Sequence, residues 1–476
     1  MKKKNRIILN VCCSAIIFII LVIIQYQTNI GNIYLNLKYA TLIGVAINVS
    51  CIVSAINVEK NISSPYILFQ ILSLVFLYGQ LICRELLNFY VKQMFDLSVL
   101  VTYEGLVEAC FLIMYNQLAL HIGFLLTKKD VEKKENIYNS IIEKKTLKKV
   151  GIILLIISII PTMFLFVRNF KYTSVSGYSG LTENTTYGFA SICNKIVPYF
   201  QIALFMLMVA EKENSKKSKL ILLFSILFYG IQMFFGNRGI PLIAVITSIW
   251  LYNKAVKKIN MRKMCFIIVL IIPLTSIINI IRTTRDDYGF EKWISNAGEL
   301  VWENLTTSNS VLEACYEMGT AIYPTAFTVE NVPQKFNYKY GKTYLLSILS
   351  IVTIDTSGSK NDLAYTMNIA SQISKEAGAP FGGSYIQEAY ANFGWFSPLI
   401  FSVFFGYLFG VLERKIKSSS NLISIVLIAY FLNPLLWTVR NVTVTLPREI
   451  AWYIVPSYIF YKLIYNSYKR GKYEKG

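Results

Sequence analysis

Long apolar blocks constrain how this chain can fold more than any other feature of its sequence. A helix needs about 20 residues to cross the ~30 Å hydrocarbon layer of a membrane, and twelve blocks of the 476-residue chain suit such helices. Charged residues make up 16% of the chain, whereas soluble domains carry about 25%. We therefore predict an all-α, polytopic membrane protein with about 12 transmembrane helices. The predicted spans are residues 7–24, 39–57, 66–83, 103–126, 150–168, 190–210, 219–236, 238–253, 264–281, 394–412, 420–438 and 449–466.

A single arginine interrupts the longest apolar run. Residues 220–253 contain one charge, Arg238, within the stretch "FFGNRGIP". A single helix of these 34 residues would be about 51 Å long, too long for a bilayer. Two spans joined by a tight turn at "GNRG" fit better, because glycine and asparagine tolerate a left-handed backbone. Pro241 suits the first turn of the returning helix, which places Arg238 at a membrane surface.

The basic residues predict topology and argue against a nucleic-acid partner. The formal net charge is +20, and the lysine-rich clusters all fall on the side of both chain ends if there are twelve spans. The positive-inside rule makes that side cytoplasmic. The first block is predicted to be a retained span, since no small-residue cleavage site follows it. The clusters are "MKKKNR", residues 128–149, "EKENSKKSK", "KAVKKINMRK", "ERKIK" and "YKRGKYEK".

Arginine is concentrated on the opposite, outer side. The chain has 36 lysines and 11 arginines, and the inner clusters use almost only lysine. Arginine binds phosphate or carboxylate with two parallel hydrogen bonds, which lysine cannot do. The pattern predicts an oxyanion held at the outer surface; sampling noise, or arginines reaching to lipid headgroups, is the alternative. The candidate anion-binding residues are Arg238, Arg282, Arg285, Arg440 and Arg448.

A long segment between the ninth and tenth predicted spans is expected to form an outer cap. A connection of this length is either functional or disordered, and its apolar-periodic stretches favour a folded, mostly helical cap. The run "TYLLSILSIVTI" within it is too short to span and is expected to lie in the membrane interface. The predicted domains are residues 1–281 with nine transmembrane helices, 282–393 as the extracytoplasmic cap, and 394–476 with three helices and a cytoplasmic tail.

Carboxylates near the outer surface are candidates for acid–base chemistry. The stretch "FGGSYIQEAYANFG" predicts a helix that begins after Ser384, with Glu388 in its first turn. Glu388 is either an acid that satisfies the helix dipole or a general base beside a glycine-lined cleft, and Asp286 is a second candidate base. His121, the only histidine, is predicted near the inner surface and is interpreted as structural. Other acidic candidates are Asp287, Glu313, Glu317, Glu104 and Glu108.

In architecture and local motifs the chain resembles the Wzy-type polymerases of O-antigen and capsular polysaccharide. The resemblance rests on many spans, a large outer loop late in the chain, "GNRG" at residues 236–239, "IIRTTR" after the ninth span, and "FGGSYIQEAYANFGWFSPLIFSVFFGYLFG". It implies glycosyl transfer at the outer face of a bacterial plasma membrane, between oligosaccharide repeat units linked to undecaprenyl diphosphate. It also implies a reaction without a metal ion or other cofactor.

The resemblance assigns roles to some of the candidate residues. Arg238 and Arg282 match positions expected to contact the diphosphate, and Glu388 matches a position expected to act as acid or base. Arg285, Arg440 and Arg448 extend this set by their place at the outer surface. Related ligases use a histidine near the reaction centre, and none is available on the outer side here, so a carboxylate would have to serve as the base. A flippase and a chain-length regulator of the same pathway are the expected protein partners.

A flippase or transporter of lipid-linked oligosaccharides is the main alternative. Twelve spans and cations lining a cavity would suit a transporter equally well. Transporters often consist of two similar halves, whereas here only the second half carries a large outer loop. This asymmetry favours an enzyme.

Overall fold

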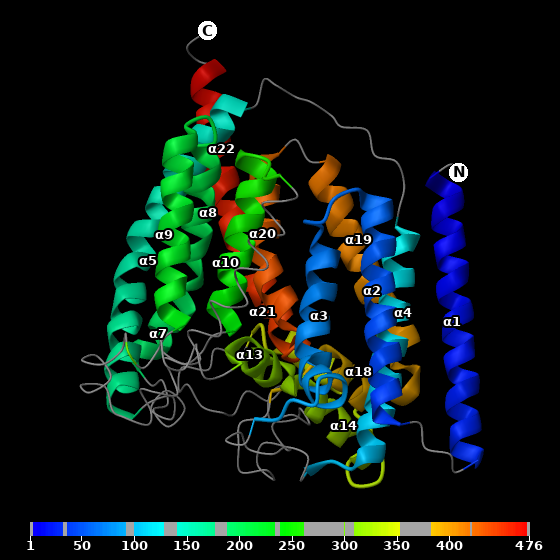
Figure 1. Ribbon diagram of the computed structural model, residues 1–476. Coiled ribbons are helices and arrows are strands. Elements are labelled where there is room, and N and C mark those ends of the chain that lie inside the picture. The colour runs from blue at the N-terminus through cyan, green and yellow to red at the C-terminus, as the bar shows by residue number, and fades with distance from the viewer. Residues whose placement is uncertain are drawn as a thin grey trace.

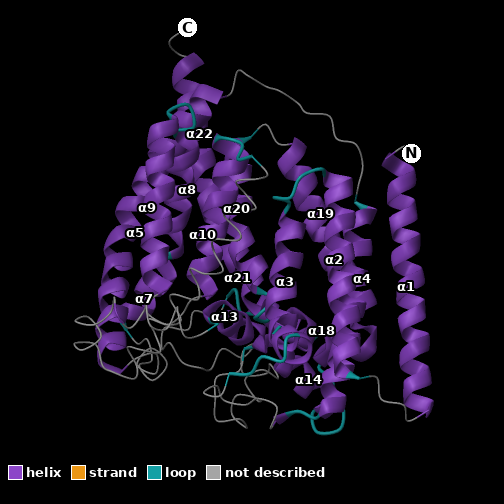
Figure 2. Cartoon of the chain, in the orientation of Figure 1, coloured by secondary structure: helices purple, strands orange, loops and turns teal. Residues whose placement is uncertain are grey.

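The computed structural model is built from helices, and no strand occurs in the residues it describes (Figures 1 and 2). These are residues 3–31, 36–91, 100–127, 140–176, 188–233, 239–260, 299, 309–352, 382–418 and 421–473. The α-helices are α1 (Lys3–Gly31), α2 (Leu37–Glu59), α3 (Pro65–Leu81), α4 (Tyr103–Leu126), α5 (Ser140–Ser176), α7 (Phe189–Ile196), α8 (Pro198–Ala210), α9 (Ser215–Met233), α10 (Gly239–Leu251), α13 (Ser310–Met318), α14 (Ile322–Asn331), α15 (Lys342–Leu349), α18 (Tyr385–Phe393), α19 (Val403–Ser418), α20 (Leu422–Trp437), α21 (Leu446–Glu449) and α22 (Val455–Tyr473). The short helical segments are η1 (Ile82–Leu86), η4 (Tyr252–Val256), η5 (Gly319–Ala321), η6 (Gly394–Phe396), η7 (Pro398–Ser402), η8 (Thr443–Thr445) and η9 (Ile450–Ile454).

Within the described residues, seven helices are long and apolar enough to cross a membrane, which confirms a polytopic all-α protein. They are Asn5–Gln27, Leu37–Glu59, Pro65–Leu86, Tyr103–Leu126, Ile141–Thr173, Phe189–Ala210 and Gly239–Val256; the pair Tyr385–Phe396 and Pro398–Ser418, bent by 118°, counts as an eighth if it is one broken span. Helical segments also cover most of the described residues of the predicted spans 219–236, 420–438 and 449–466. The predicted span 264–281 lies outside the described residues, so the total of twelve stays a prediction.

Side chains at the helix starts supply the hydrogen-bond acceptors that the first backbone N–H groups require. Asn36 accepts from the N–H of Lys38 at the start of α2, and Thr102 accepts from the N–H of Gly105 at the start of α4. In the membrane-spanning part, small residues then allow helices to touch. A Cβ added to Gly406 of α19 would lie 1.9 Å from the carbonyl oxygen of Leu120 in α4. Such close approach at small residues is a common way to pair helices in lipid.

The helices form two groups side by side (Figure 1). Helices α1, α2, α3, α4 and α19 pack together in one group, and α5, α7, α8, α9, α10, α20 and α22 form the other. Helix α20 touches α3 and α19 across the boundary. The first residue of α1 and the last residue of α22 lie at the same end of the molecule, which we name the terminal end (Figure 1). Helices α13, α14 and α18 lie at the opposite end, the cap end, where α13 packs on α3 and α14 on α4.

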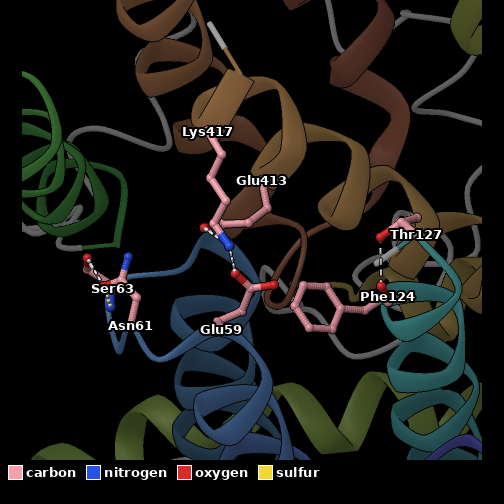
Figure 3. Close-up of polar contacts among 7 residues, drawn as sticks. All are labelled: Glu59, Asn61, Ser63, Phe124, Thr127, Glu413 and Lys417. Carbon is pink, nitrogen blue, oxygen red and sulfur yellow. Dashed lines mark hydrogen bonds and ion pairs between the residues drawn. The ribbon is translucent and has the colours of Figure 1, made fainter. Parts of the chain in front are cut away.

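Ion pairs stabilise the terminal end. Lys417 of α19 extends between two carboxylates from different helices (Figure 3). It forms an ion pair with Glu59 at the end of α2, and its Nζ lies 4.0 Å from Oε1 of Glu413, one turn earlier in α19. The side chains of Glu59 and Glu413 are each only 1% exposed, so the positive charge of Lys417 helps to offset two buried carboxylates.

Candidate functional site

The connection between α20 and α22 at the cap end carries two of the candidate arginines. Helix α20 ends at Trp437, and a turn follows in which the N–H of Arg440 donates to the carbonyl of Trp437 at 3.0 Å. The chain then forms η8 and α21, which contains Arg448 near its end. We name residues 438–449 the arginine loop. Both arginine side chains are half-buried at this loop.

Glu388 fixes the arginine loop to α18. The Ser384 hydroxyl accepts from the N–H of Gln387 at 3.0 Å, so α18 begins where the sequence predicts, and Glu388 lies in its first turn. Oε2 of Glu388 accepts from the backbone N–H of Thr443 at 2.6 Å and from its hydroxyl at 2.7 Å. The residue is 1% exposed, and hydrogen bonds to a charged acceptor in such surroundings are about twice as strong as neutral ones.

The other oxygen of this carboxylate, Oε1, has no hydrogen bond of regular geometry. The hydroxyl of Thr343, from the start of α15, lies against the same carboxylate. The Tyr344 ring stacks on that of Phe401 at 5.1 Å, and its buried hydroxyl also has no hydrogen-bond partner.

Arg440 lies against the glycine pair that precedes α18. A Cβ added to Gly382 would lie 3.1 Å from the carbonyl oxygen of Arg440 and 3.9 Å from its Cγ. On its other side, the Arg440 guanidinium carbon lies 5.6 Å from the ring centroid of Phe76 in α3. The backbone N–H of Tyr385 donates to the carbonyl of Thr438 at 2.9 Å. The "FGGS" stretch and the arginine loop are therefore neighbours in space.

The N-terminus of α10 reaches the same place. A Cβ added to Gly239, the first residue of α10, would lie 2.1 Å from the ring of Trp437. The centroids of the Trp437 and Phe76 rings are 6.4 Å apart. The Arg440 guanidinium lies over the Phe76 ring. Gly239 directly follows Arg238 in the chain. Arg238 itself, Arg282, Arg285, Asp286 and Asp287 lie outside the described residues.

The side chain of Arg448 binds a backbone carbonyl group next to α15. Its Nε donates to the carbonyl oxygen of Ser350, just after α15, at 2.9 Å, and its guanidinium carbon lies 5.5 Å from the ring of Trp452. Trp452 in turn donates from Nε1 to the carbonyl of Ile351 at 2.9 Å. The arginine loop is thus held to α15 as well as to α18.

The remaining acidic candidates lie on α4 and α13. Glu108 of α4 accepts from Gln25 of α1 at 2.5 Å, and Glu104 is exposed one turn earlier. Glu313 and Glu317 lie in α13, where burial raises the pKa of Glu313. His121 lies near the terminal end and bonds through both ring nitrogens, to Tyr66 at 2.8 Å and to Ser54 at 2.9 Å. Across the part of the chain that the structure describes, no three His, Cys, Asp or Glu side chains come close enough to hold a metal ion.

Together these features define a polytopic membrane protein in which short helices at one end, α13, α14, α15 and α18, meet the bundle near an arginine-bearing loop and a buried carboxylate. The model of the O-antigen polysaccharide polymerase Wzy family matches residues 8–471, nearly the whole chain. The chain belongs to this family, and it is a bacterial membrane polymerase that acts on lipid-linked oligosaccharide repeat units. This confirms the family predicted from the sequence and favours a polymerase over a flippase or transporter. No curated protein and no solved structure matches the chain.

Sequence reasoning missed the residues that shape this site. Two of them, Thr443 and Thr343, contact the predicted residue Glu388. The third, Trp437, contacts Gly239, which directly follows the predicted Arg238. None belongs to a recognisable motif, because threonine and tryptophan are ordinary residues at the end of a membrane helix. They share only their position: each lies close to the first or last residue of a helical segment at the cap end.

Proposed function

We propose that the arginine loop, the start of α18 and the N-terminus of α10 together form the site of glycosyl transfer. In this reaction a hydroxyl oxygen of the acceptor repeat unit attacks the anomeric carbon of the growing glycan. The bond from that carbon to the diphosphate of undecaprenyl diphosphate breaks, and its electron pair leaves with the diphosphate. The proton of the acceptor hydroxyl passes to a protein base, and the glycan grows by one repeat unit.

The observation that carries this proposal is the meeting of three distant segments at one point. Gly382 contacts Arg440, Arg440 lies over Phe76, and Phe76 packs on the Trp437 ring that touches Gly239. A helix N-terminus provides free N–H donors and positive potential, which suits a phosphate. Arg238, one residue before this N-terminus, would add its guanidinium to that of Arg440.

The arginines are proposed to stabilise the charge that develops on the leaving diphosphate. Fixed cations aimed at a developing negative charge are a major source of catalysis. Arg238 and Arg440 are the central pair, with Arg448 at the far end of the loop. Arg282 and Arg285 complete the set from the segment that follows the predicted ninth span. With guanidinium groups in this role, the reaction is proposed to need no metal ion.

Glu388 is proposed as the base, with Asp286 as the second carboxylate of the site. Its Oε1 has no hydrogen bond of regular geometry and could accept a proton, while Oε2 accepts two hydrogen bonds from Thr443. The carboxylate would then have two tasks, one on each oxygen: it would position the arginine loop and accept the proton of the sugar hydroxyl. Because Glu388 is buried, a sugar would reach it only after the cap has moved.

The cap end is proposed to face the cell exterior, with both chain ends in the cytoplasm. Lysines such as Lys148, Lys258 and Lys417 lie in segments at the terminal end, as the positive-inside rule requires of a cytoplasmic surface. A flippase would then deliver repeat units to the face where the arginine loop lies, and a chain-length regulator would act on the same face.

Substitution of Arg440 by lysine tests this assignment. Lysine keeps the charge but loses the bidentate fork, so Arg440→Lys in a strain lacking the native gene should leave surface glycan mostly at one repeat unit. Arg414→Lys is a matched control, because Arg414 is also half-buried and lies 6.0 Å from the Tyr407 ring, in the part of α19 near the terminal end. Glycan of normal length in the Arg440→Lys strain, with normal protein level, would refute the assignment.

A further inference from the structure

Asn392 is buried in α18, one helical turn after Glu388. The residue is 0% exposed, and its position four residues after Glu388 places the two side chains on one face of the helix. Nδ2 of Asn392 donates to the backbone carbonyl oxygen of Glu388 at 2.8 Å. An amide nitrogen carries two donors, so its second N–H is available for a contact outside α18.

That second contact joins Asn392 to the start of α15. Nδ2 also donates to the hydroxyl oxygen of Thr343 at 2.8 Å, and Oδ1 accepts from the backbone N–H of Gly341 at 2.9 Å. Gly341 directly precedes α15 and has a φ of 80°, a left-handed conformation that favours glycine. The N–H of Tyr340 donates to the carbonyl of Asn392 at 3.2 Å, so the turn before α15 is held against the end of α18.

These contacts give the hydrogen bonds a fixed direction. A backbone N–H can only donate, so the amide atom that faces Gly341 must be Oδ1 of Asn392, and Nδ2 must face Thr343. The oxygen of Thr343 is then the acceptor, and its own hydroxyl proton is directed away from Asn392. The same hydroxyl lies against the carboxylate of Glu388, which can only accept while it is ionised. A directed chain thus runs from Gly341 through Asn392 and Thr343 to Glu388.

We propose that Asn392 is a positioning residue for glycosyl transfer, which turns the Thr343 hydroxyl toward the Glu388 carboxylate and so fixes the orientation of this base. The inference rests on the proposed function, in which Glu388 takes the proton, and it adds a residue that acts through Thr343 and not on the substrate. Thr443 holds Oε2 of the same carboxylate from the arginine loop. The base is thus oriented from two elements, α15 and the arginine loop, and proton transfer requires such a fixed geometry.

Substitution of Asn392 by aspartate tests this role. Asn392→Asp keeps the size of the side chain and an oxygen toward Gly341, but it replaces the donor that faces Thr343 by a second acceptor. The Thr343 hydroxyl would then donate to position 392 and be lost to Glu388. With purified full-length protein and lipid-linked repeat unit, kcat should fall about 10- to 100-fold, as expected for the loss of one hydrogen bond to a charged group. KM should change little.

Two sets of variants serve as controls. Thr343→Val removes the hydroxyl and should lower kcat as Asn392→Asp does, whereas Thr343→Ser retains it and should keep kcat near normal. Asn331→Asp in α14 is matched to Asn392→Asp, because Nδ2 of Asn331 also donates to a carbonyl four residues earlier, that of Phe327, at 2.8 Å. Asn331→Asp should leave kcat unchanged. If Asn392→Asp does not accumulate, an equal kcat in Thr343→Val and Thr343→Ser refutes the proposal.

The decisive comparison repeats Asn392→Asp in a Glu388→Gln background. If Asn392 acts through the base, the added substitution should lower kcat no further, because residues that act as a unit have non-additive effects. The same fold loss in both backgrounds would indicate a merely structural role and would overturn the proposal, as would a change confined to KM. A large loss in Glu388→Gln with none in Asn392→Asp would refute this inference alone. A normal kcat in Glu388→Gln would instead remove the proposed base, and the inference with it.

Discussion

The carboxylate of Glu388 accepts hydrogen bonds from both donors of Thr443, the backbone N–H at 2.6 Å and the hydroxyl at 2.7 Å. Glu388 belongs to α18, and Thr443 belongs to the loop that follows α20. Because Thr443 lies between Arg440 and Arg448, this contact sets the position of the arginines relative to the cap. A buried carboxylate that accepts two hydrogen bonds on Oε2 and none of regular geometry on Oε1 can combine positioning with proton transfer.

Two substitutions separate those tasks. Glu388→Gln retains an oxygen that can accept from Thr443 but removes the base, and general base catalysis contributes about 10²- to 10⁴-fold. Thr443→Val removes only the hydroxyl donor and leaves the N–H in place. We expect the rate of polymerisation to fall by at least ~100-fold in Glu388→Gln and by much less in Thr443→Val. Similar modest losses in both variants, measured with purified protein, would make Glu388 a positioning residue only.

The contact between Gly382 and Arg440 predicts that even one methyl group at this position impairs the enzyme. A Cβ there would lie 3.1 Å from the carbonyl oxygen of Arg440, so the arginine loop would have to shift. Gly382→Ala should therefore shorten the glycan chains while protein level stays near normal. Gly230→Ala in α9 is the control, since a Cβ at Gly230 meets nothing within 4 Å and alanine favours a helix. Chains of equal length in both variants would show that the loop position is not critical.

The ion pair at the terminal end predicts an effect on stability. Lys417→Met removes the cation paired with the buried Glu59 carboxylate, and removal of one member of an ion pair that contains a buried charge is destabilising. The melting temperature of the detergent-purified protein should fall clearly. Adding Glu59→Gln to Lys417→Met should recover part of the loss, because the buried negative charge is then removed together with the cation. A double variant less stable than Lys417→Met would contradict this account of the junction.

Topology gives an independent prediction. Alkaline phosphatase is active only outside the cytoplasm, so a fusion after Asn337, an exposed residue that follows α14 at the cap end, should be active. A fusion after Lys258, which is exposed beyond η4, should be inactive. The reverse pattern would place the arginine loop in the cytoplasm and would remove the proposed site from the outer surface.

Hydropathy and capping residues were sufficient to predict much of the fold. Apolar blocks predicted helices because a chain in lipid must satisfy its backbone hydrogen bonds within each segment. The start of α18 was predicted from Ser384, whose side chain caps the helix locally. The bend of 118° between α18 and α19 was not predicted. Gly394, with φ of 55°, and Pro398 mark the break, but composition alone made residues 394–412 look like one straight span.

The site was only partly predictable because its contacts join residues far apart in the chain. Arg440 was selected as an arginine at the outer surface, yet its neighbours Phe76 and Gly382 come from α3 and the approach to α18. The pairing of Glu388 with Thr443 depends on how two helix ends meet, which no local pattern encodes. Arg448 was predicted as an anion contact, and the structure adds a bond to the carbonyl of Ser350 that sequence reasoning had no means to foresee.

The most direct test of the central claim is the affinity of the purified protein for undecaprenyl diphosphate. The claim is that arginines from separate helix ends bind the lipid diphosphate, so Arg440→Gln should weaken binding by about tenfold or more. Arg414→Gln, near the other end of the molecule, should bind with the same Kd as the unmodified protein. Equal affinity in all three proteins would show that Arg440 does not hold the diphosphate and would contradict the account.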